Sequence, residues 1–250
     1  MIITISTQKG GTGKTTTAQG LAFGLRSKGY RVLLIDLDEQ QAGLSSIMGC
    51  KPSHTTAYEM LKGECSAADA IQHTDLGDII PRSSRLGNIE ADLRGAGREL
   101  RLKRALDGLK GYDFIIIDTP PASGVLIDNA LTVSDYVIIP TQADVMAFYA
   151  LEQGLKTINT VKDYTNPNLK ILGILITRYN ARTSLSQQVI KGLEARAESI
   201  GTSLFETHMR ESVAIREDQA EGKNTMDRRN GNAVADLKNL TSEFLKKVGA

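Results

Sequence analysis

The sequence predicts an α/β fold in which a mostly parallel, twisted sheet carries helices on both of its faces. Short runs of apolar, β-branched residues recur along the 250-residue chain, and longer helix-like stretches separate them. Runs that are apolar at nearly every position are typical of strands buried on both faces of a parallel sheet. The sequence shows neither a linker nor a low-complexity tract. We therefore expect one domain over residues 1–250.

The expected strands share this apolar, β-branched character: Ile2–Ser6, Val32–Ile35, Phe114–Ile117, Tyr136–Ile139 and Ile171–Ile176. A weaker strand is expected near Ile79. Apolar residues at helical spacing predict the helices Thr15–Ser27, Leu93–Leu109, Ala147–Val161, Ser184–Ser199 and Ala233–Val248. Strands alternating with helices in this way indicate a parallel sheet rather than a sandwich or a barrel.

The composition excludes several classes of protein. The 30 basic and 29 acidic residues give a formal net charge of +1, so any binding to a polyanion depends on local patches. The two cysteines and three histidines do not show the spacing of a zinc or iron–sulfur site. No apolar stretch reaches the roughly 18 residues that a membrane span needs. We expect a cytoplasmic protein.

The strongest motif is a glycine-rich loop that follows the first strand and opens the first helix. It reads Gln8-Lys9-Gly10-Gly11-Thr12-Gly13-Lys14-Thr15-Thr16. Glycines let backbone N–H groups curl around phosphate oxygens, and the helix N-terminus adds positive potential. Lys14 is expected to reach the terminal phosphates, and Thr15 to offer its hydroxyl to Mg²⁺. The sequence therefore predicts a P-loop NTPase domain.

The loop departs from the general P-loop pattern, because Gln8 stands where that pattern has glycine. The run KGGTGKTT resembles instead the deviant Walker A motif of the ParA/MinD family of dimerising ATPases, and most closely that of the short, Soj-like ParA proteins of DNA partition. The resemblance continues in residues 32–40, 98–106 and 114–121, and it covers nearly the whole chain. It implies a weak, partner-stimulated ATPase with ATP and Mg²⁺ as cofactors.

The resemblance also implies roles for residues around the phosphates. Lys9 would reach across a homodimer to the phosphates on the partner, Asp38 would orient the attacking water, and Asp36 would support the lysine and the metal. Asp118 ends an apolar strand, where an acidic residue usually holds Mg²⁺ through water. Without the resemblance, each aspartate would also fit a capping role in a turn or helix, and Lys9 would fit a solvated loop.

The base of the nucleotide is expected to lie near Arg178, after the fifth strand, and near Met209 and Arg210. Relatives carry Ile-Pro-Arg at the second of these places, whereas this chain has His208-Met209-Arg210. The expected cofactor-binding residues are then Lys9, Gly10, Gly11, Thr12, Gly13, Lys14, Thr15, Thr16, Asp36, Arg178, Met209 and Arg210.

Three kinds of protein share such a nucleotide site. A reductase like the nitrogenase iron protein needs cluster cysteines, and no cysteine follows Cys65. We therefore expect a DNA partition ATPase that dimerises with ATP, binds double-stranded DNA non-specifically and is released when a ParB-like centromere-binding protein stimulates hydrolysis. Such a protein would be associated with the nucleoid. The alternatives are a MinD-like membrane-cycling ATPase and a ParA-like positioner of a protein cargo.

By the same resemblance, Arg182 in the segment 180–183 is expected to contact DNA, and Arg216 is a second candidate. Alternatively, each arginine is a surface residue paired with an acid such as Glu217. Residues 244–248 could lie on a membrane, but their apolar stripe continues from Leu237, which favours a helix packed on the sheet. Because Ile2 already begins the first strand, we expect no helix-turn-helix segment and no operator-specific repression.

Overall fold

The computed structural model describes residues 1–39, 43–179 and 184–250, and these form one sheet of seven strands. Neighbouring strands follow the order β3-β4-β2-β5-β1-β6-β7, and only the edge pair β3–β4 is antiparallel. The strands are β1 (Ile2–Ile5), β2 (Val32–Asp36), β3 (Gln72–Thr74), β4 (Gly77–Ile80), β5 (Phe114–Asp118), β6 (Tyr136–Gln142) and β7 (Lys170–Thr177). The predicted fold class is confirmed.

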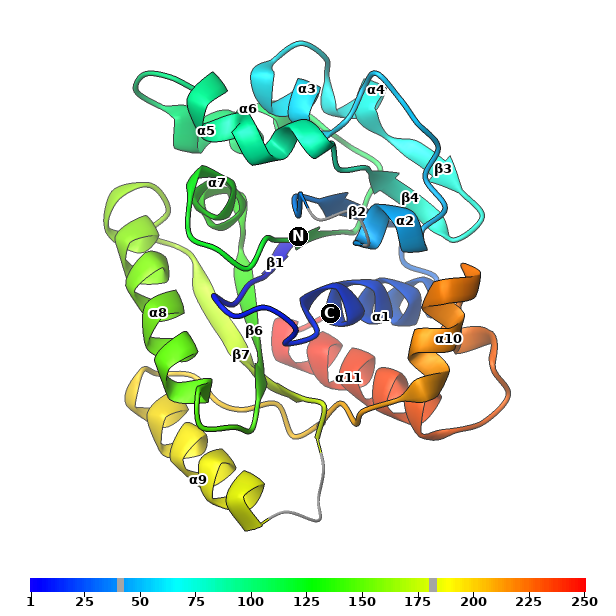
Figure 1. Cartoon of the computed structure of the whole chain (residues 1–250), viewed down its shortest axis with the longest axis vertical. Coiled ribbons are helices and arrows are strands. Elements are labelled where there is room, and N and C mark those ends of the chain that lie inside the picture. The colour runs from blue at the N-terminus through cyan, green and yellow to red at the C-terminus, as the bar shows by residue number, and fades with distance from the viewer. Residues whose placement is uncertain (40–42, 180–183) are drawn as a thin grey trace.

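Helices cover both faces of this sheet (Figure 1). Their bounds are α1 (Lys14–Ser27), α2 (Leu44–Ile47), α3 (Ala57–Lys62), α4 (Ala67–Ala70), α5 (Ile89–Asp92), α6 (Arg101–Leu106), α7 (Val125–Val133), α8 (Ala147–Tyr164), α9 (Ser184–Ser199), α10 (Val213–Glu221) and α11 (Asn232–Val248). Side chains of α1 and α11 share one core with Leu34 of β2, whereas α3, α6 and α7 share another with the adjacent Leu33. Successive strand residues point to opposite faces, so these two cores lie on opposite sides of the sheet. A third core joins α7, α8 and α9 to β6 and β7.

The central strands bring the chemistry-bearing residues to one edge of the sheet. β5 lies between β1 and β2, and Asp118 is in register with both Ile5 and Asp36. Because these strands are parallel, their carboxyl ends meet at the edge where the glycine-rich loop leaves β1. Ligands of open α/β sheets bind at such an edge.

The last helix, α11, packs against α1 and the sheet (Figure 1). A Cβ on Gly24 of α1 would lie 1.9 Å from the Thr241 hydroxyl oxygen, so this contact requires glycine. The rings of Phe114 and Phe244 meet edge to face at 5.6 Å between centroids. The apolar stripe of α11 is thus buried, as expected for a helix packed on the sheet. Among the described helices, none is long and apolar enough to span a bilayer.

Two features of the helical pattern differ from the sequence prediction. The expected helix Leu93–Leu109 is wrong in its first part: a 3₁₀ turn begins at Arg98, and α6 follows it. Gly97, just before that turn, has a φ of 79°, in the left-handed region that ends a regular helix. Helices α7 and α10, by contrast, had no counterpart among the expected elements.

Candidate functional site

The glycine-rich loop joins β1 to α1 in the geometry that phosphate binding requires. Gly13 directly precedes α1 and has a φ of 82°, a conformation that glycine adopts without strain. Lys14 is the first residue of the helix, so the unpaired N–H groups of the first turn of α1 adjoin the loop. The loop is further held to β7, because the Thr177 hydroxyl donates to the carbonyl of Thr12 at 2.7 Å. This end of α1 is suited to an anion.

Thr15 and Asp118 are brought together as the sequence predicted. The Thr15 hydroxyl donates to Asp118 Oδ2 at 2.7 Å. The other carboxylate oxygen, Oδ1, is buried and has no hydrogen-bond partner among the described residues. A buried oxygen of this kind needs a partner to offset its lost hydration. Because Mg²⁺ takes oxygen ligands and keeps several waters, a magnesium-bound water beside Asp118 fits this place.

No group of three or more His, Cys, Asp or Glu side chains in the described part of the chain is arranged to hold a metal ion. The donor set at this edge is instead one hydroxyl and one carboxylate, from Thr15 and Asp118. That set is too small to hold Mg²⁺ by itself, but it suits an ion that is also bound by nucleotide phosphates.

Burial perturbs the charged groups at this edge. It raises the pKa of Asp118 to about 8, and the neighbouring Asp36 adds to the rise, while the Thr15 hydrogen bond and Lys14 oppose it. Burial also lowers the pKa of Lys14, against the opposing effect of Asp118 and Asp38. Burial thus disfavours the charged form of each group, and a bound cation and anion would favour it.

Asp36 accepts hydrogen bonds from the segment that follows β2. Its Oδ2 accepts hydrogen bonds from the Ser45 backbone N at 2.7 Å and from the Ser45 hydroxyl at 2.6 Å, and its Oδ1 accepts from the backbone N of Asp38 at 3.1 Å. Burial nevertheless raises the pKa of Asp36 to about 6. Through these bonds, Asp36 fixes the backbone of the buried Asp38 at the same edge as Asp118.

Lys9 is held within its own chain. Its ammonium group forms an ion pair with the carboxylate of Asp144, in the segment between β6 and α8. Sequence reasoning found Lys9 but missed its partner. Asp144 follows the end of a strand, which is a weak signal without knowledge of how β6 and β1 pair.

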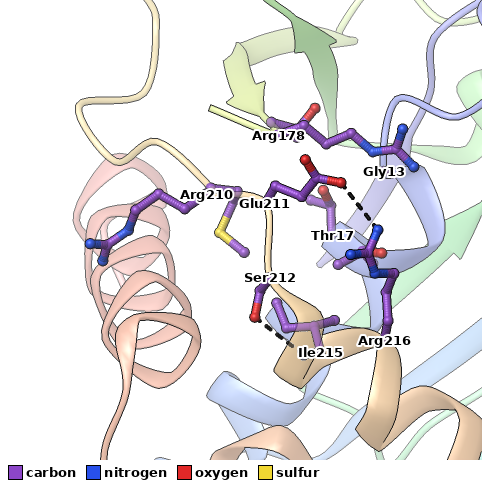
Figure 2. Close-up of a pocket in the computed structure, with 11 residues that line it drawn as sticks. Gly13, Thr17, Arg178, Arg210, Glu211, Ser212, Ile215 and Arg216 are labelled. Atoms are coloured by element: carbon purple, nitrogen blue, oxygen red, sulfur yellow. Dashed lines mark hydrogen bonds and ion pairs between the residues drawn. The ribbon is translucent and has the colours of Figure 1, made fainter. Parts of the chain in front are cut away.

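A pocket opens beside the loop (Figure 2), and the structure brings several predicted residues to it. The space inside is about 80 Å³. Its lining consists of Gly13, Thr16, Thr17, Thr177, Arg178, Met209, Arg210, Glu211, Ser212, Ile215 and Arg216. The lining thus joins the phosphate loop to both segments that were expected to hold the base. Arg216, expected to contact DNA, lines the same pocket.

The arginines of this pocket point in different directions. Arg178 has a φ of 49°, which is rare for a residue other than glycine. The guanidinium of Arg210 turns away from the pocket toward α11 (Figure 2). Its Nε donates to Asp236 Oδ2 of that helix at 3.0 Å. Arg216 instead donates to Glu211 Oε1 at 3.1 Å (Figure 2). Arg178 and Arg216 are therefore better placed than Arg210 to offer a guanidinium to a ligand.

Sequence reasoning missed Glu211 and Ser212. Ser212 precedes α10 and its hydroxyl accepts from the backbone N of Ile215 at 3.3 Å, so it caps that helix. A serine three residues before an apolar position was the available signal. The other expected DNA residue, Arg182, lies outside the described residues.

Comparison with known proteins identifies the family. Residues 1–171 match the family model described as an AAA domain. Over 231 residues, the chain is 38% identical to the chromosome partitioning protein ParA of Caulobacter vibrioides, a match covering 89% of this chain and 85% of that protein. The chain belongs to the ParA/Soj family of P-loop ATPases. The resemblance inferred from the sequence is confirmed.

Two further similarities extend this result. The chain is 39% identical to the sporulation initiation inhibitor protein Soj of Bacillus subtilis, over 89% of this chain and 88% of Soj. It also resembles the crystal structure of cobyrinic acid a,c-diamide synthase from Mycobacterium smegmatis with a bound ATP analogue and magnesium. That likeness has a TM-score of 0.75 and 36% identity, and it covers 88% of this chain and 92% of that one. A structure similar to this chain therefore binds an ATP analogue and magnesium.

Proposed function

We propose that this chain is an ATP-dependent DNA partition ATPase. It binds ATP and Mg²⁺, pairs with a second copy, binds double-stranded DNA non-specifically as a dimer, and is released when a ParB-like partner stimulates hydrolysis. Membership of the ParA/Soj family supports this reading. The observation that carries it is the Thr15–Asp118 hydrogen bond next to the buried Lys14, with one carboxylate oxygen left without a partner among the described residues.

The loop of residues 9–16 is the phosphate-binding element in this proposal. Its backbone N–H groups and Lys14 hold the phosphates, and the Thr15 hydroxyl and, through water, Asp118 hold Mg²⁺. When bound, Mg²⁺ neutralises charge on the phosphates. The base lies in the pocket beside Gly13 and Thr16, against Arg178, Met209 and the backbone of Arg210.

Hydrolysis needs an aligned water and charge stabilisation more than covalent chemistry by the protein. Asp38 orients the water that attacks the terminal phosphorus, and ADP and phosphate are released. Lys9 of each chain approaches the phosphates on the other chain and stabilises the charge that develops there, as an arginine finger does. The hydrogen bonds that Asp36 accepts from the backbone N of Ser45 and of Asp38 support the role of Asp38.

DNA binding is assigned to surface arginines of the dimer. The net charge of +1 gives a single chain little attraction for DNA, and pairing doubles every basic patch. Arg182 and the exposed Arg216 are the proposed contacts. A membrane-cycling role has less support, because the apolar stripe of α11 is buried against α1 and the sheet.

The test is ATP binding measured by calorimetry with Mg²⁺, followed by light scattering and DNA anisotropy with and without ATP. Lys14→Ala is expected to lose measurable ATP binding, and with it dimer formation and DNA binding. Lys28→Ala, at the other end of α1, is the matched control and should behave as wild type. ATP binding that is unchanged by Lys14→Ala would remove the assignment of the loop, and DNA binding that needs no ATP would remove the proposed cycle.

A further inference from the structure

Exposed apolar side chains gather next to the phosphate loop. Four of the seven large hydrophobic residues that are exposed in the described structure lie within residues 145–149. Val145, Met146 and Tyr149 are 74%, 52% and 63% exposed, and Phe148 lies over Gly192 of α9. Residues 145–149, here called the apolar segment, include the first turn of α8. A cluster of this kind on an otherwise polar surface is typical of an interaction site.

Asp144 links the apolar segment to Lys9. Its Oδ1 accepts a hydrogen bond from the backbone N of Met146 at 2.9 Å, which closes the turn just before α8. Its Oδ2 forms the ion pair with Lys9. One carboxylate therefore fixes both the lysine of the phosphate loop and the beginning of the apolar segment.

Two more bonds tie the phosphate loop to this part of the chain. The side-chain amide of Gln142, at the end of β6, donates to the carbonyl of Gly11 at 2.6 Å. The side-chain amide of Gln8 donates to the Thr157 hydroxyl of α8 at 2.7 Å. These bonds join the phosphate loop to the strand end and to the helix that flank the apolar segment.

We propose that the apolar segment is a docking surface for a second copy of this chain, and that Asp144 holds Lys9 within its own chain until that copy covers the segment. The inference rests on the proposed function, in which Lys9 approaches phosphates on the partner. To do so, Lys9 must leave Asp144. The apolar segment starts at the very next residue, so a copy close enough to receive Lys9 also covers it.

The Lys9–Asp144 ion pair is weak enough to be broken when a dimer forms and made again when it separates. The side chains of Lys9 and Asp144 are 26% and 40% exposed, and a partly exposed ion pair shifts an equilibrium by only about two- to five-fold. The phosphates of a bound nucleotide carry several negative charges, so they attract Lys9 more strongly than one carboxylate does. Without nucleotide on the partner, Lys9 gains nothing by leaving Asp144. The pair therefore favours the single chain until both copies hold ATP.

Asp144→Asn tests whether the ion pair with Asp144 keeps Lys9 within its own chain. Asparagine keeps the oxygen that accepts from the backbone N of Met146 but removes the charge that pairs with the lysine. We expect the ATP-dependent dimer to form more tightly, by about two- to five-fold for each protomer at low salt, with the gain shrinking as salt screens the pair. Asp163→Asn, an exposed carboxylate near the far end of α8, is the matched control. Sedimentation or light scattering at a series of protein concentrations gives the dissociation constant.

A double variant shows whether the effect runs through Lys9. In a Lys9→Ala background, Asp144→Asn should bring no further gain, because the charge that it released is absent. An equal gain in both backgrounds would assign the effect to the turn before α8 or to net charge, and would overturn the proposal that Asp144 restrains Lys9. So would an Asp144→Asn protein that dimerises as wild type or more weakly.

Tyr149→Ser tests the docking surface. We expect it to raise the dissociation constant of the ATP-dependent dimer by about ten-fold or more, because a large apolar side chain is no longer buried between copies. ATP binding by the single chain should stay unchanged. Tyr164→Ser, which alters an 82% exposed tyrosine at the other end of the same helix, is the control. Equal dimerisation of the two serine variants would overturn the docking surface.

These outcomes separate the inference from the proposed function. A wild-type chain that binds ATP and Mg²⁺ but stays monomeric contradicts the proposed cycle, and the inference fails with it. A wild-type chain that dimerises with ATP, together with Asp144 and Tyr149 variants that match their controls, leaves the cycle standing and overturns the inference alone.

Discussion

Asp36 and Asp118 lie opposite each other at the carboxyl ends of β2 and β5, and both residues are 0% exposed. Two carboxyl groups in this position cannot both ionise without cost, because burial and their mutual repulsion favour the neutral forms. Hydrogen bonds from Ser45 to Asp36 and from Thr15 to Asp118 offset part of this cost. This edge therefore favours a bound cation, which would lower the cost of ionising both carboxyl groups.

The stability of the nucleotide-free, magnesium-free protein should therefore fall as pH rises. The folded pKa of Asp118 is raised to about 8, above the unfolded value of about 4. The folded state thus binds this proton more tightly, so its contribution to stability is complete below the unfolded pKa and is lost as pH rises through about 8. Urea unfolding between about pH 5 and pH 9 measures the free energy of unfolding.

Asp118→Asn is the control for this pH dependence, since asparagine resembles the protonated acid and does not titrate. We expect a flatter profile between about pH 5 and pH 9 for this variant. A wild-type stability that increases across the same range, or an unaltered slope in the variant, would show that Asp118 is ionised in the ligand-free fold.

A pair of glycine substitutions tests the packing of α11 on α1. Gly24→Ala should destabilise the fold by about 1–3 kcal/mol, because the new Cβ would lie 1.9 Å from the Thr241 hydroxyl oxygen. Gly154→Ala, in α8, meets no heavy atom within 4 Å and should instead stabilise the fold by about 0.5–1 kcal/mol. Thermal and urea unfolding give both values. A Gly24→Ala protein as stable as wild type would mean that α11 does not approach α1 so closely.

Local sequence patterns were sufficient for the parallel strands and for the phosphate loop, but they missed the short antiparallel edge strand β3. A buried strand, a glycine-rich turn and a helix start are each visible within a few residues, and Asp118 could be placed because it directly follows an apolar run. The same reasoning failed where a contact depends on distant segments. The Lys9–Asp144 pair joins residues 135 positions apart, and the turn of Arg210 toward Asp236 depends on where α11 packs.

Helix α7 illustrates the same limit within the fold. Six of its nine residues, Val125–Val133, are apolar, and a buried Asn129 is among the other three. The Asn129 side chain accepts from the backbone N of Leu102 at 2.9 Å and donates to the carbonyl of Arg98 at 2.9 Å. Asn129 interrupts the apolar pattern of the helix in the sequence. Its burial is explained only by the tertiary structure, in which a neighbouring segment forms hydrogen bonds with its side chain.

Substitutions of Asp38 and Lys9 should separate dimer assembly from hydrolysis. Asp38→Ala is expected to bind ATP and accumulate as a dimer with little turnover, because the attacking water loses its orienting group. Lys9→Ala should bind ATP but dimerise weakly and hydrolyse it poorly. Light scattering and phosphate release in the presence of ATP measure both properties. A monomeric Asp38→Ala protein with full turnover would contradict its assigned role.

DNA binding should require ATP, ignore DNA sequence and depend steeply on salt. Each phosphate contact contributes about −0.9 to the slope of log K against log salt, so a dimer that uses Arg182 and Arg216 of each chain should give a slope of about −3 to −4. Arg182→Ala should flatten this slope by around 2 per dimer and leave DNA-free ATP turnover unchanged. Arg216→Ala tests a residue that also lines the nucleotide pocket, so the ATP affinity of this variant must be measured beside the slope.

Fluorescence anisotropy on two unrelated duplexes across a salt series tests the predicted DNA binding. Tight binding without nucleotide, a strong preference for one duplex, or indifference to Arg182 would each contradict the prediction. ATP-dependent binding to anionic liposomes, with none to DNA, would favour a membrane-cycling ATPase instead.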